Sequence, residues 1–209
     1  MMRIQKMQQV TKGSFLRNCK KDILIADLSI DSRKIMNPDS TLFIAINGEQ
    51  RSGLQFVKDA YLKGVRNFIV GEKIDLSFFE EEVNIIWVKD PVTALQRIGI
   101  YIRHQYDYPV VAITGSNGKT VVKEWLSKIL SGSEPYNLDG GVVKSPKSYN
   151  SQIGVPLSVW NMQADNTIGI FEAGISKVGE MARLEKILTP DIGIFTNIEI
   201  CLQCAFCLG

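Results

Sequence analysis

The chain has 209 residues, of which 45% are hydrophobic and 22% are charged, and its formal net charge at pH 7 is +2. This length suits one large domain or two modest ones, and the composition is that of a globular protein with a buried core. A net charge so close to zero, without a cluster of lysine and arginine, argues against a nucleic-acid partner. The N-terminus lacks the apolar segment of a signal peptide, and no apolar run is long enough to span a bilayer. We therefore expect a cytoplasmic protein with no membrane insertion.

The first half of the sequence predicts a small α/β domain, which we place at residues 1–108. Short runs rich in β-branched and aromatic residues predict strands at 41–46, 65–70 and 83–88. Between the first two runs a helix is predicted to end at Gly64. Its apolar face is expected to contain Leu54, Val57, Tyr61 and Leu62.

A second helix is predicted to begin after Asp90. Asp90 followed by Pro91 is typical of a helix N-cap and first turn. The apolar residues that follow at helical spacing are Val92, Leu95, Ile98 and Ile102. His104, the only histidine, comes near the end of this helix. We interpret it as a residue of the surface or of the joint between domains, and a mechanism that needs two histidines is excluded.

From residue 109 onward, continuous apolar strands alternate with amphipathic helices. The strands are predicted at 110–114, 168–173 and 191–198, and the helices at 119–130 and around 178–188. Strands of this kind are typical of a parallel sheet that is covered by helices on both faces. We place this second domain at residues 109–209.

A glycine-rich loop joins the first of these strands to its helix. In TGSNGKT, Thr114 to Thr120, we expect backbone N–H groups to surround an anion at the helix N-terminus. Lys119 can supply a point charge for phosphate and Thr120 a hydroxyl ligand for Mg²⁺. The usual phosphate-loop pattern has glycine where this chain has Ile113, so the loop is shorter than the standard one. A glycine-rich turn without a ligand is the alternative. The nucleotide-binding candidates are Gly115, Ser116, Asn117, Gly118, Lys119 and Thr120.

Glu172 lies at the end of the strand predicted at 168–173. In doubly wound sheets, ligands bind at the carboxyl ends of the strands. A carboxylate at this position can complete a Mg²⁺ shell with Thr120. The alternative is that Glu172 caps the next turn, and the residue pattern leaves both open.

Four segments occur in the order and spacing of the Mur ligase family: ITGSNGKTVVKEW, SPKSYNSQIGVPLSVW, FEAGISKVGEM and TPDIGIFTNI. The N-terminal DSRKIMNPDSTLFIAINGEQRSGLQFVKDAYLKGVRNFIV resembles the UDP-sugar-binding domain of that family. Within the family, the chain is similar to members that add D-alanyl-D-alanine to UDP-N-acetylmuramoyl-tripeptide. GKTVVKEWL and SYNSQIGVPLSVW are especially similar to the Bacteroidetes form, which is fused to an alanine racemase. The resemblance covers residues 25–198.

The resemblance implies a small N-terminal α/β UDP-sugar-binding domain followed by a truncated P-loop-type parallel-sheet ATPase domain. It implies ATP and Mg²⁺ as cofactors and amide formation through an acyl phosphate, in peptidoglycan precursor synthesis. Lys119 and Glu172 match catalytic positions, and Thr120 and Glu172 match magnesium ligands. The substrate-binding residues that it implies are Ser32, Arg33, Asn150 and Ser151.

After TPDIGIFTNI the family continues with a histidine for a second magnesium, a modified lysine, an adenine-binding segment and a C-terminal domain. This chain instead reads EICLQCAFCLG. We therefore expect an incomplete portion of the enzyme that is inactive alone. The cysteine spacing in the tail, 199–209, begins like an iron–sulfur run, but we favour an unrelated terminus. Two other functions stay open, a non-catalytic nucleotide- or UDP-sugar-binding fragment and another P-loop NTPase or kinase.

Overall fold

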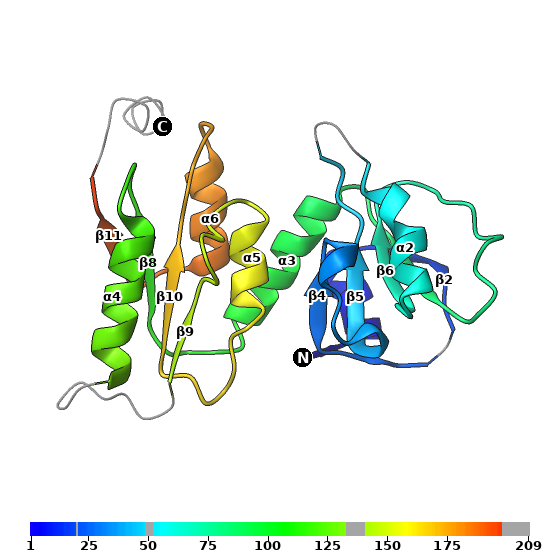
Figure 1. Cartoon of the computed structure of the whole chain (residues 1–209), viewed down its shortest axis with the longest axis horizontal. Coiled ribbons are helices and arrows are strands. Elements are labelled where there is room, and N and C mark those ends of the chain that lie inside the picture. Colours follow the sequence, from blue (N-terminus) through cyan, green and yellow to red (C-terminus); the bar gives the residue numbers. More distant parts are fainter. Residues whose placement is uncertain (20, 49–51, 133–140, 198–209) are drawn as a thin grey trace. The chain divides into compact units, whose positions relative to one another are not determined.

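The computed structural model describes residues 1–19, 21–48, 52–132 and 141–197 (Figure 1). The chain divides into two compact units, Met1–Ile98 and Gly99–Gly209. The expected division of function between residues 1–108 and 109–209 stays a prediction, and the tail 199–209 lies outside the described residues. Within the described residues, none of the helices has the length and apolar character needed to cross a bilayer.

The first unit is built on a five-stranded sheet with the strand order β2-β7-β6-β5-β4. Its strands are β2 (Ser14–Arg17), β4 (Asp27–Ser29), β5 (Thr41–Ile44), β6 (Asn67–Val70) and β7 (Asn84–Trp87). All neighbours are parallel except β2, which runs antiparallel to β7. A separate two-stranded sheet pairs β1 (Met2–Arg3) with β3 (Leu24–Ile25). The strand predictions at 41–46, 65–70 and 83–88 are confirmed as β5, β6 and β7.

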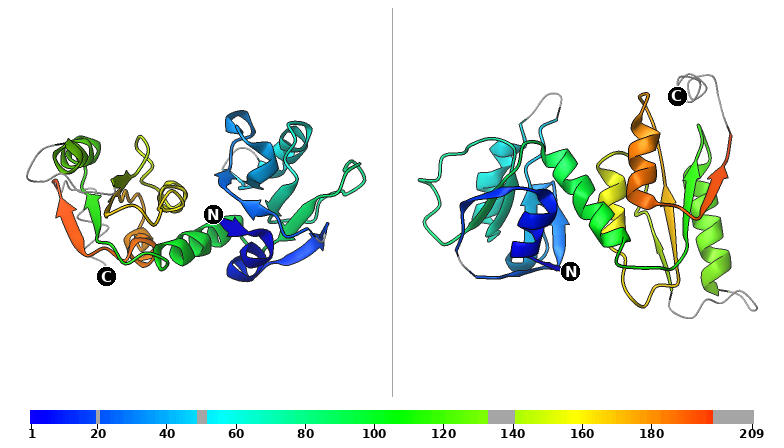
Figure 2. Two further views of the ribbon diagram at one scale, coloured as in Figure 1. Left: turned by 90° about the horizontal axis from the view of Figure 1, so that it is seen from below. Right: turned by 180° about the vertical axis from the view of Figure 1, so that it is seen from behind.

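Helices lie on opposite faces of this larger sheet (Figures 1 and 2). They are α1 (Ile4–Thr11) and α2 (Val57–Leu62), with short 3-10 turns η1 (Ser32–Lys34), η2 (Pro38–Ser40) and η3 (Gly53–Phe56). An aromatic core that includes Phe43, Phe68 and Phe79 packs with residues of α2. Burying these large side chains gives the unit a core of its own.

The apolar face that the sequence predicts for α2 is partly wrong. The helix buries Val57, Ala60 and Tyr61, whereas Leu62 is 72% exposed. The reason is that residues 53–56 form the 3-10 turn η3 before α2 begins. A 3-10 turn has 3.0 residues rather than 3.6, so the α-helical phase counted from Leu54 does not carry through to Leu62.

Helix α3 (Pro91–Arg103) begins where Asp90 was predicted to cap it. The Asp90 carboxylate accepts hydrogen bonds from the N–H groups of Val92 and Thr93, both at 3.1 Å. Leu95, Ile98 and Ile102 are buried as expected. His104 is exposed in the turn after the helix, as expected of a surface residue.

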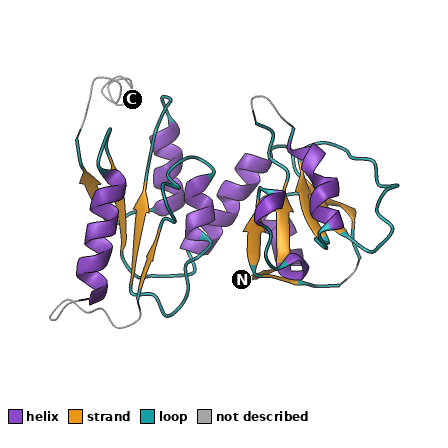
Figure 3. Ribbon diagram, in the orientation of Figure 1, coloured by secondary structure: helices purple, strands orange, loops and turns teal. Residues whose placement is uncertain are grey.

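The second unit contains a four-stranded parallel sheet with the order β11-β8-β10-β9. Its strands are β8 (Val110–Thr114), β9 (Val142–Lys144), β10 (Ile168–Glu172) and β11 (Ile192–Phe195). Its helices are α4 (Lys119–Gly132), α5 (Gly154–Val159) and α6 (Glu180–Leu188). Figure 3 shows strands and helices alternating through this unit, and Figure 2 shows α4 and α6 on opposite faces of the sheet. The predicted parallel sheet with two covered faces is confirmed.

Strand β8 is central in this sheet and fixes the position of the site. Glu172 of β10 pairs with Ile113, and Phe195 of β11 pairs with Thr114. Three parallel strands therefore end at the same edge, directly beside the glycine-rich loop. Such an edge is where open α/β sheets bind their ligands.

Candidate functional site

The glycine-rich loop occupies residues 115–118, between β8 and α4. Gly115 has φ +138° and Gly118 has φ +82°, a backbone region that glycine enters without steric cost. A Cβ atom at Gly115 would also lie 2.1 Å from Oγ1 of Thr196. The loop can keep this shape only with glycine at residue 115.

The residues that follow β11 brace the loop from the other side. The N–H of Ser116 donates to the Asn197 carbonyl at 3.0 Å, and the N–H of Asn117 donates to Asn197 Oδ1 at 2.8 Å. The Thr196 hydroxyl donates to the Asn117 carbonyl. Two amides that were expected to surround an anion are thus directed to Asn197. The loop is stabilised by a segment about 80 residues further along the chain.

Lys119 is half-buried and folds back over the loop. Its ammonium group donates to the Gly115 carbonyl and, at 3.4 Å, to the Ser116 carbonyl. These contacts hold a positive charge directly above the turn, at the first residue of α4. The N-terminus of this 14-residue helix adds a partial positive charge at the same point.

Thr120 and Glu172 meet at the start of α4. The Thr120 hydroxyl donates to Glu172 Oε2 at 3.1 Å, and the Glu172 N–H donates to the Ser145 hydroxyl at 3.0 Å. Glu172 is completely buried, whereas Thr120 is exposed. The Glu172 side chain therefore contacts α4 rather than the turn that follows β10.

The second carboxylate oxygen of Glu172 has an unusual environment. In the described part of the chain, Oε1 is buried without a hydrogen bond of good geometry, and the Lys123 ammonium lies 3.0 Å from it as an ion pair. A buried carboxylate oxygen normally accepts hydrogen bonds or contacts a cation. Among the described residues, no three His, Cys, Asp or Glu side chains gather to hold a metal. A cation here would need ligands such as hydroxyl, phosphate or water oxygens.

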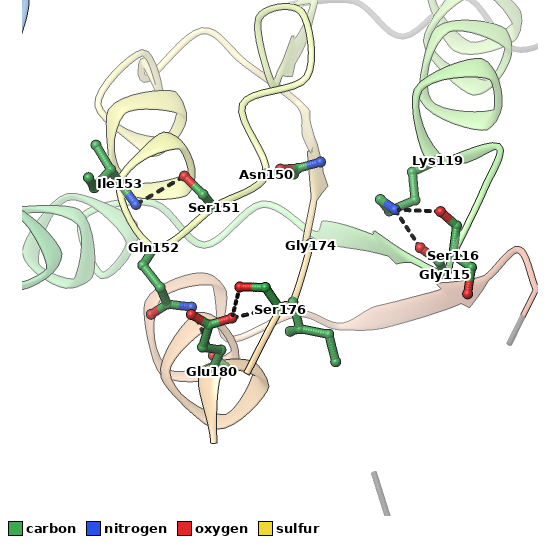
Figure 4. A pocket seen from close by; sticks show the side chains of 11 residues that line it. Gly115, Ser116, Lys119, Asn150, Ser151, Gln152, Ile153, Gly174, Ser176 and Glu180 are labelled. Carbon is green, nitrogen blue, oxygen red and sulfur yellow. Dashed lines mark hydrogen bonds between the residues drawn. The ribbon is translucent and has the colours of Figure 1, made fainter. Parts of the chain in front are cut away.

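A cavity of about 450 Å³ opens beside the loop (Figure 4). Figure 4 shows Lys119 over the loop on one side and Asn150 on the other. The lining residues are Gly115, Ser116, Lys119, Asn150, Ser151, Gln152, Ile153, Gly174, Ile175, Ser176 and Glu180. The predicted residues Lys119, Asn150 and Ser151 therefore share one cavity. Thr120 and Glu172 are next to each other but do not line it.

Backbone hydrogen bonds hold the far wall of the cavity in place. The N–H of Gly174 donates to the Asn150 carbonyl at 2.7 Å. The Ser151 hydroxyl accepts from the N–H of Gly154 at 3.1 Å, at the start of α5. The first bond fixes the backbone of Asn150, and the second holds the Ser151 hydroxyl itself at the start of α5.

Glu180 closes one end of the cavity at the start of α6. Its carboxylate accepts from the N–H groups of Ser176 at 2.7 Å and Lys177 at 2.9 Å, and from the Ser176 hydroxyl at 3.0 Å. Burial raises the pKa of Glu180, but these hydrogen bonds outweigh burial and lower it overall. Glu180 is thus held as a carboxylate, and its Oε2 accepts all three of these bonds.

The sequence of this site matches known proteins. Residues 113–200 match the Mur ligase middle domain. The UDP-N-acetylmuramoyl-tripeptide–D-alanyl-D-alanine ligase of Borreliella burgdorferi is 32% identical over 200 residues, which are 92% of this chain and 42% of the relative. The same ligase of Treponema pallidum is 34% identical over 82% of this chain and 37% of the relative. The chain belongs to the Mur ligase family.

Solved Mur ligase structures share this fold. MurF from Acinetobacter baumannii superposes with a TM-score of 0.82 at 27% identity, over 98% of this chain and 43% of that one. MurF ligase from Thermotoga maritima in complex with ADP gives a TM-score of 0.69 at 29% identity, over 85% of this chain and 38% of that one. The chain thus spans about two fifths of the length of these Mur ligases.

The two predicted residues of the N-terminal unit of this Mur ligase chain have different environments. Ser32 is buried, and its carbonyl accepts from the Lys63 ammonium at 2.8 Å. Arg33 is exposed and makes two bonds to Asp31, Nε to Oδ1 and Nη2 to Oδ2, both 2.9 Å. These bonds lower the pKa of Asp31 to about 2. Arg33 therefore lies in a solvated turn, whereas Ser32 is buried.

The motifs found in the sequence did not identify several residues of the site. They are Lys123, Gln152, Ile153, Gly174, Ile175, Ser176, Glu180, Thr196 and Asn197. For Thr196 and Asn197 there was a usable signal, because both follow a parallel strand at the ligand-binding edge of the sheet. For Lys123 the signal was its position three residues after Thr120, which places both on neighbouring turns of one helix.

Proposed function

We propose that the chain is part of a cytoplasmic ATP-dependent ligase that joins D-alanyl-D-alanine to UDP-N-acetylmuramoyl-tripeptide in peptidoglycan precursor synthesis. The observation that carries the proposal is the cavity that joins the glycine-rich loop to residues 150–153 and 174–180. A simple nucleotide hydrolase needs the loop and water, whereas a ligase needs a second wall that holds the carboxylate to be activated. The relatives that match over most of this chain carry the name of this ligase.

The glycine-rich loop is proposed to bind the phosphates of ATP. Lys119 would leave the carbonyls of Gly115 and Ser116 and turn to the phosphate oxygens, a stronger interaction because both partners are charged. Gly115, Ser116, Asn117, Gly118 and Thr120 would form the rest of the phosphate site, with the N–H groups of Ser116 and Asn117 released from Asn197. Nucleotide binding agrees with the solved Thermotoga maritima ligase, which is in complex with ADP.

Thr120 and Glu172 are proposed to hold Mg²⁺, and the local chemistry fits this ion. Both supply oxygen atoms, the ligand type that Mg²⁺ prefers, and the Thr120 hydroxyl lies 3.1 Å from Glu172 Oε2, close enough for both oxygens to contact one ion. A cation would reach the pair from the side of Thr120, since Thr120 is exposed and Glu172 is not. The ion would neutralise phosphate charge during the transfer.

The proposed reaction has two steps. The terminal carboxylate of the tripeptide attacks the γ-phosphorus of ATP, giving an acyl phosphate and ADP. The amine of D-alanyl-D-alanine then attacks the acyl carbon, loses a proton and releases inorganic phosphate. Lys119 would stabilise the charge on the transferred phosphoryl group, and Asn150 and Ser151 would hold the carboxylate in line with it.

The N-terminal unit is proposed to bind the UDP-sugar through Ser32 and Arg33. In an amide NMR spectrum of the whole chain, shifts on adding UDP-N-acetylmuramoyl-tripeptide should cluster near Ser32, Arg33 and Gly48. Shifts confined to residues beyond Pro109 would contradict this part of the proposal. We also propose that the longer protein carries an alanine racemase portion, because the segments 118–126 and 148–160 resemble that fused form.

A coupled phosphate-release assay tests the ligase function. The longer protein of which this chain forms part should release phosphate only when ATP, UDP-N-acetylmuramoyl-tripeptide and D-alanyl-D-alanine are all present. Phosphate release without D-alanyl-D-alanine would instead indicate another NTPase, and formation of ADP without phosphate release would indicate a kinase. Nucleotide binding without any release would indicate a non-catalytic binding protein. The chain alone, which spans about two fifths of its relatives, is expected to bind nucleotide weakly and to give no turnover.

A further inference from the structure

Lys123 is a completely buried lysine on α4, three residues after Thr120. Its side chain is 0% exposed, and so is that of Glu172. Burying an ammonium group is costly unless it is paired and hydrogen-bonded. A lysine in this position therefore needs specific partners, and the sequence motifs had given it no role.

The Lys123 ammonium connects three separate segments of the unit. It lies 3.0 Å from Glu172 Oε1, at the end of β10, and 3.2 Å from Glu124 Oε1 on its own helix. It also donates to the carbonyl of Ser145 at 2.9 Å and to that of Lys147. An ammonium group has three hydrogens, and the two carbonyls take two of them, so one remains for the two carboxylates.

The segment that supplies the two carbonyls leads directly into the cavity wall. Lys147 has φ +52°, an uncommon conformation for a residue other than glycine, and its carbonyl faces Lys123. The Ser145 hydroxyl also accepts the Glu172 N–H. Asn150, three residues after Lys147, lines the cavity. The buried Lys123 ammonium thus fixes both the Glu172 carboxylate beside Thr120 and the segment 145–147 that leads to Asn150.

We infer that Lys123 is a positioning residue for the magnesium–nucleotide site. Its ammonium holds Oε1 of Glu172, which leaves Oε2 directed at the Thr120 hydroxyl, where the cation is proposed to bind. Removing a side chain that orients a metal ligand typically lowers metal affinity 10- to 100-fold. This inference rests on the proposed function, since it concerns the same site.

The test compares nucleotide binding with and without Mg²⁺ by calorimetry. Lys123→Met keeps the apolar stem and removes the charge, and Lys144→Met is its control. Lys144 pairs with Glu124 in the same network, and within the described residues its ammonium forms no ion pair with Glu172. In Lys123→Met, the gain in ADP affinity on adding Mg²⁺ should fall about 10- to 100-fold. Its ADP affinity in EDTA and its circular dichroism spectrum should match the wild type, and Lys144→Met should behave as wild type throughout.

A folded Lys123→Met chain that keeps the wild-type response to Mg²⁺ would overturn the inference and leave the proposed function intact. A wild-type chain whose ADP affinity does not respond to Mg²⁺ would overturn both. If Lys123→Met does not fold, the wild-type chain supplies the answer through lysine side-chain ¹⁵N NMR, with Lys123→Arg identifying the signal. That signal should shift on adding Mg²⁺–ADP and stay in place with ADP in EDTA. An unchanged signal in both cases rejects the role.

Discussion

Thr120 and Glu172 are 52 residues apart in the sequence, and the hydroxyl of one lies 3.1 Å from the carboxylate of the other. The contact joins the first turn of α4 to the end of β10. It exists because β8 and β10 are adjacent parallel strands in register, with Glu172 opposite Ile113. Two features therefore form the proposed cation site. The register of β10 with β8 places Glu172, and the first turn of α4 places Thr120.

Replacing Thr120 by valine removes the donor to Glu172 and leaves Oε2 without this bond. A hydrogen bond to a charged group contributes about 1.5–3 kcal/mol, so we expect Thr120→Val to lower the free energy of unfolding by an amount in this range. Urea denaturation measures it. Thr120→Ser keeps the hydroxyl and should stay within about 0.5 kcal/mol of wild type. A loss in Thr120→Ser as large as that in Thr120→Val would contradict this account, because Thr120→Ser keeps the hydroxyl that bonds to Glu172.

Replacing Lys119 by alanine should weaken ATP binding by about 1.5–3 kcal/mol, the contribution of a charge-assisted hydrogen bond. Calorimetry on the two proteins gives the difference. Lys128→Ala is the matched control, because Lys128 is an exposed lysine on the same helix. Unchanged affinity in Lys119→Ala would remove the phosphate-loop assignment.

Alanine substitutions at Gly115 and Gly118 should differ in severity. Both residues have positive φ, so each substitution costs about 1–2 kcal/mol in backbone strain. At Gly115 the new Cβ would also lie 2.1 Å from Thr196 Oγ1, whereas at Gly118 its nearest neighbour is Thr196 Cβ at 3.9 Å. Gly115→Ala should therefore be the more destabilising in urea denaturation. A Gly118→Ala chain that is as unstable as Gly115→Ala would contradict this account of the loop.

Asp31 should titrate far below an ordinary aspartate. The hydrogen bond from the Arg33 side chain is the main cause that lowers the pKa of Asp31 from 3.8 to about 2. Because the folded pKa lies below the unfolded one, the contribution to stability is present above pH 3.8 and is lost as the pH falls toward 2. A ¹³C NMR titration of the carboxyl carbon measures this pKa directly.

The two basic neighbours of Asp31 separate the causes of this shift. Arg33→Ala should return the pKa of Asp31 toward 3.8, since it removes the side-chain hydrogen bonds. Lys34→Ala should have little effect, because its ammonium is 3.9 Å from the carboxylate. A larger rise in Lys34→Ala than in Arg33→Ala would mean that the Arg33 pair does not persist in solution.

The parts of the fold that were predictable have strong local patterns. Strand β8, the loop and α4 follow from an apolar run, glycines and a helical period within about 20 residues. Asp90 was found as a cap because its partners are only two and three residues away. The position of Glu172 at a strand end could also be predicted from the local sequence. Its contact with Thr120 could not, because that contact depends on the pairing of β10 with β8.

Other parts depend on contacts that local patterns do not encode. Strand β9 has only three residues and gains its partner, β10, from a different stretch of the chain. Helix α5 is six residues long and contains Gly154 and Pro156, which are poor helix formers, so tertiary packing must hold it. Lys123 is an ordinary helix residue in sequence terms, and only its burial beside Glu172 distinguishes it.

The brace that Thr196 and Asn197 provide for the glycine-rich loop has a consequence for the order of folding. The loop leaves the ribosome about 80 residues before the residues that hold its amides. Parallel strands far apart in sequence pair slowly, because the intervening chain must first be closed into a loop. The loop residues are therefore synthesised well before Thr196 and Asn197 can fix the conformation of the loop. Nucleotide affinity should appear during refolding with the slow phase in which β11 joins β8, after most helical structure has formed.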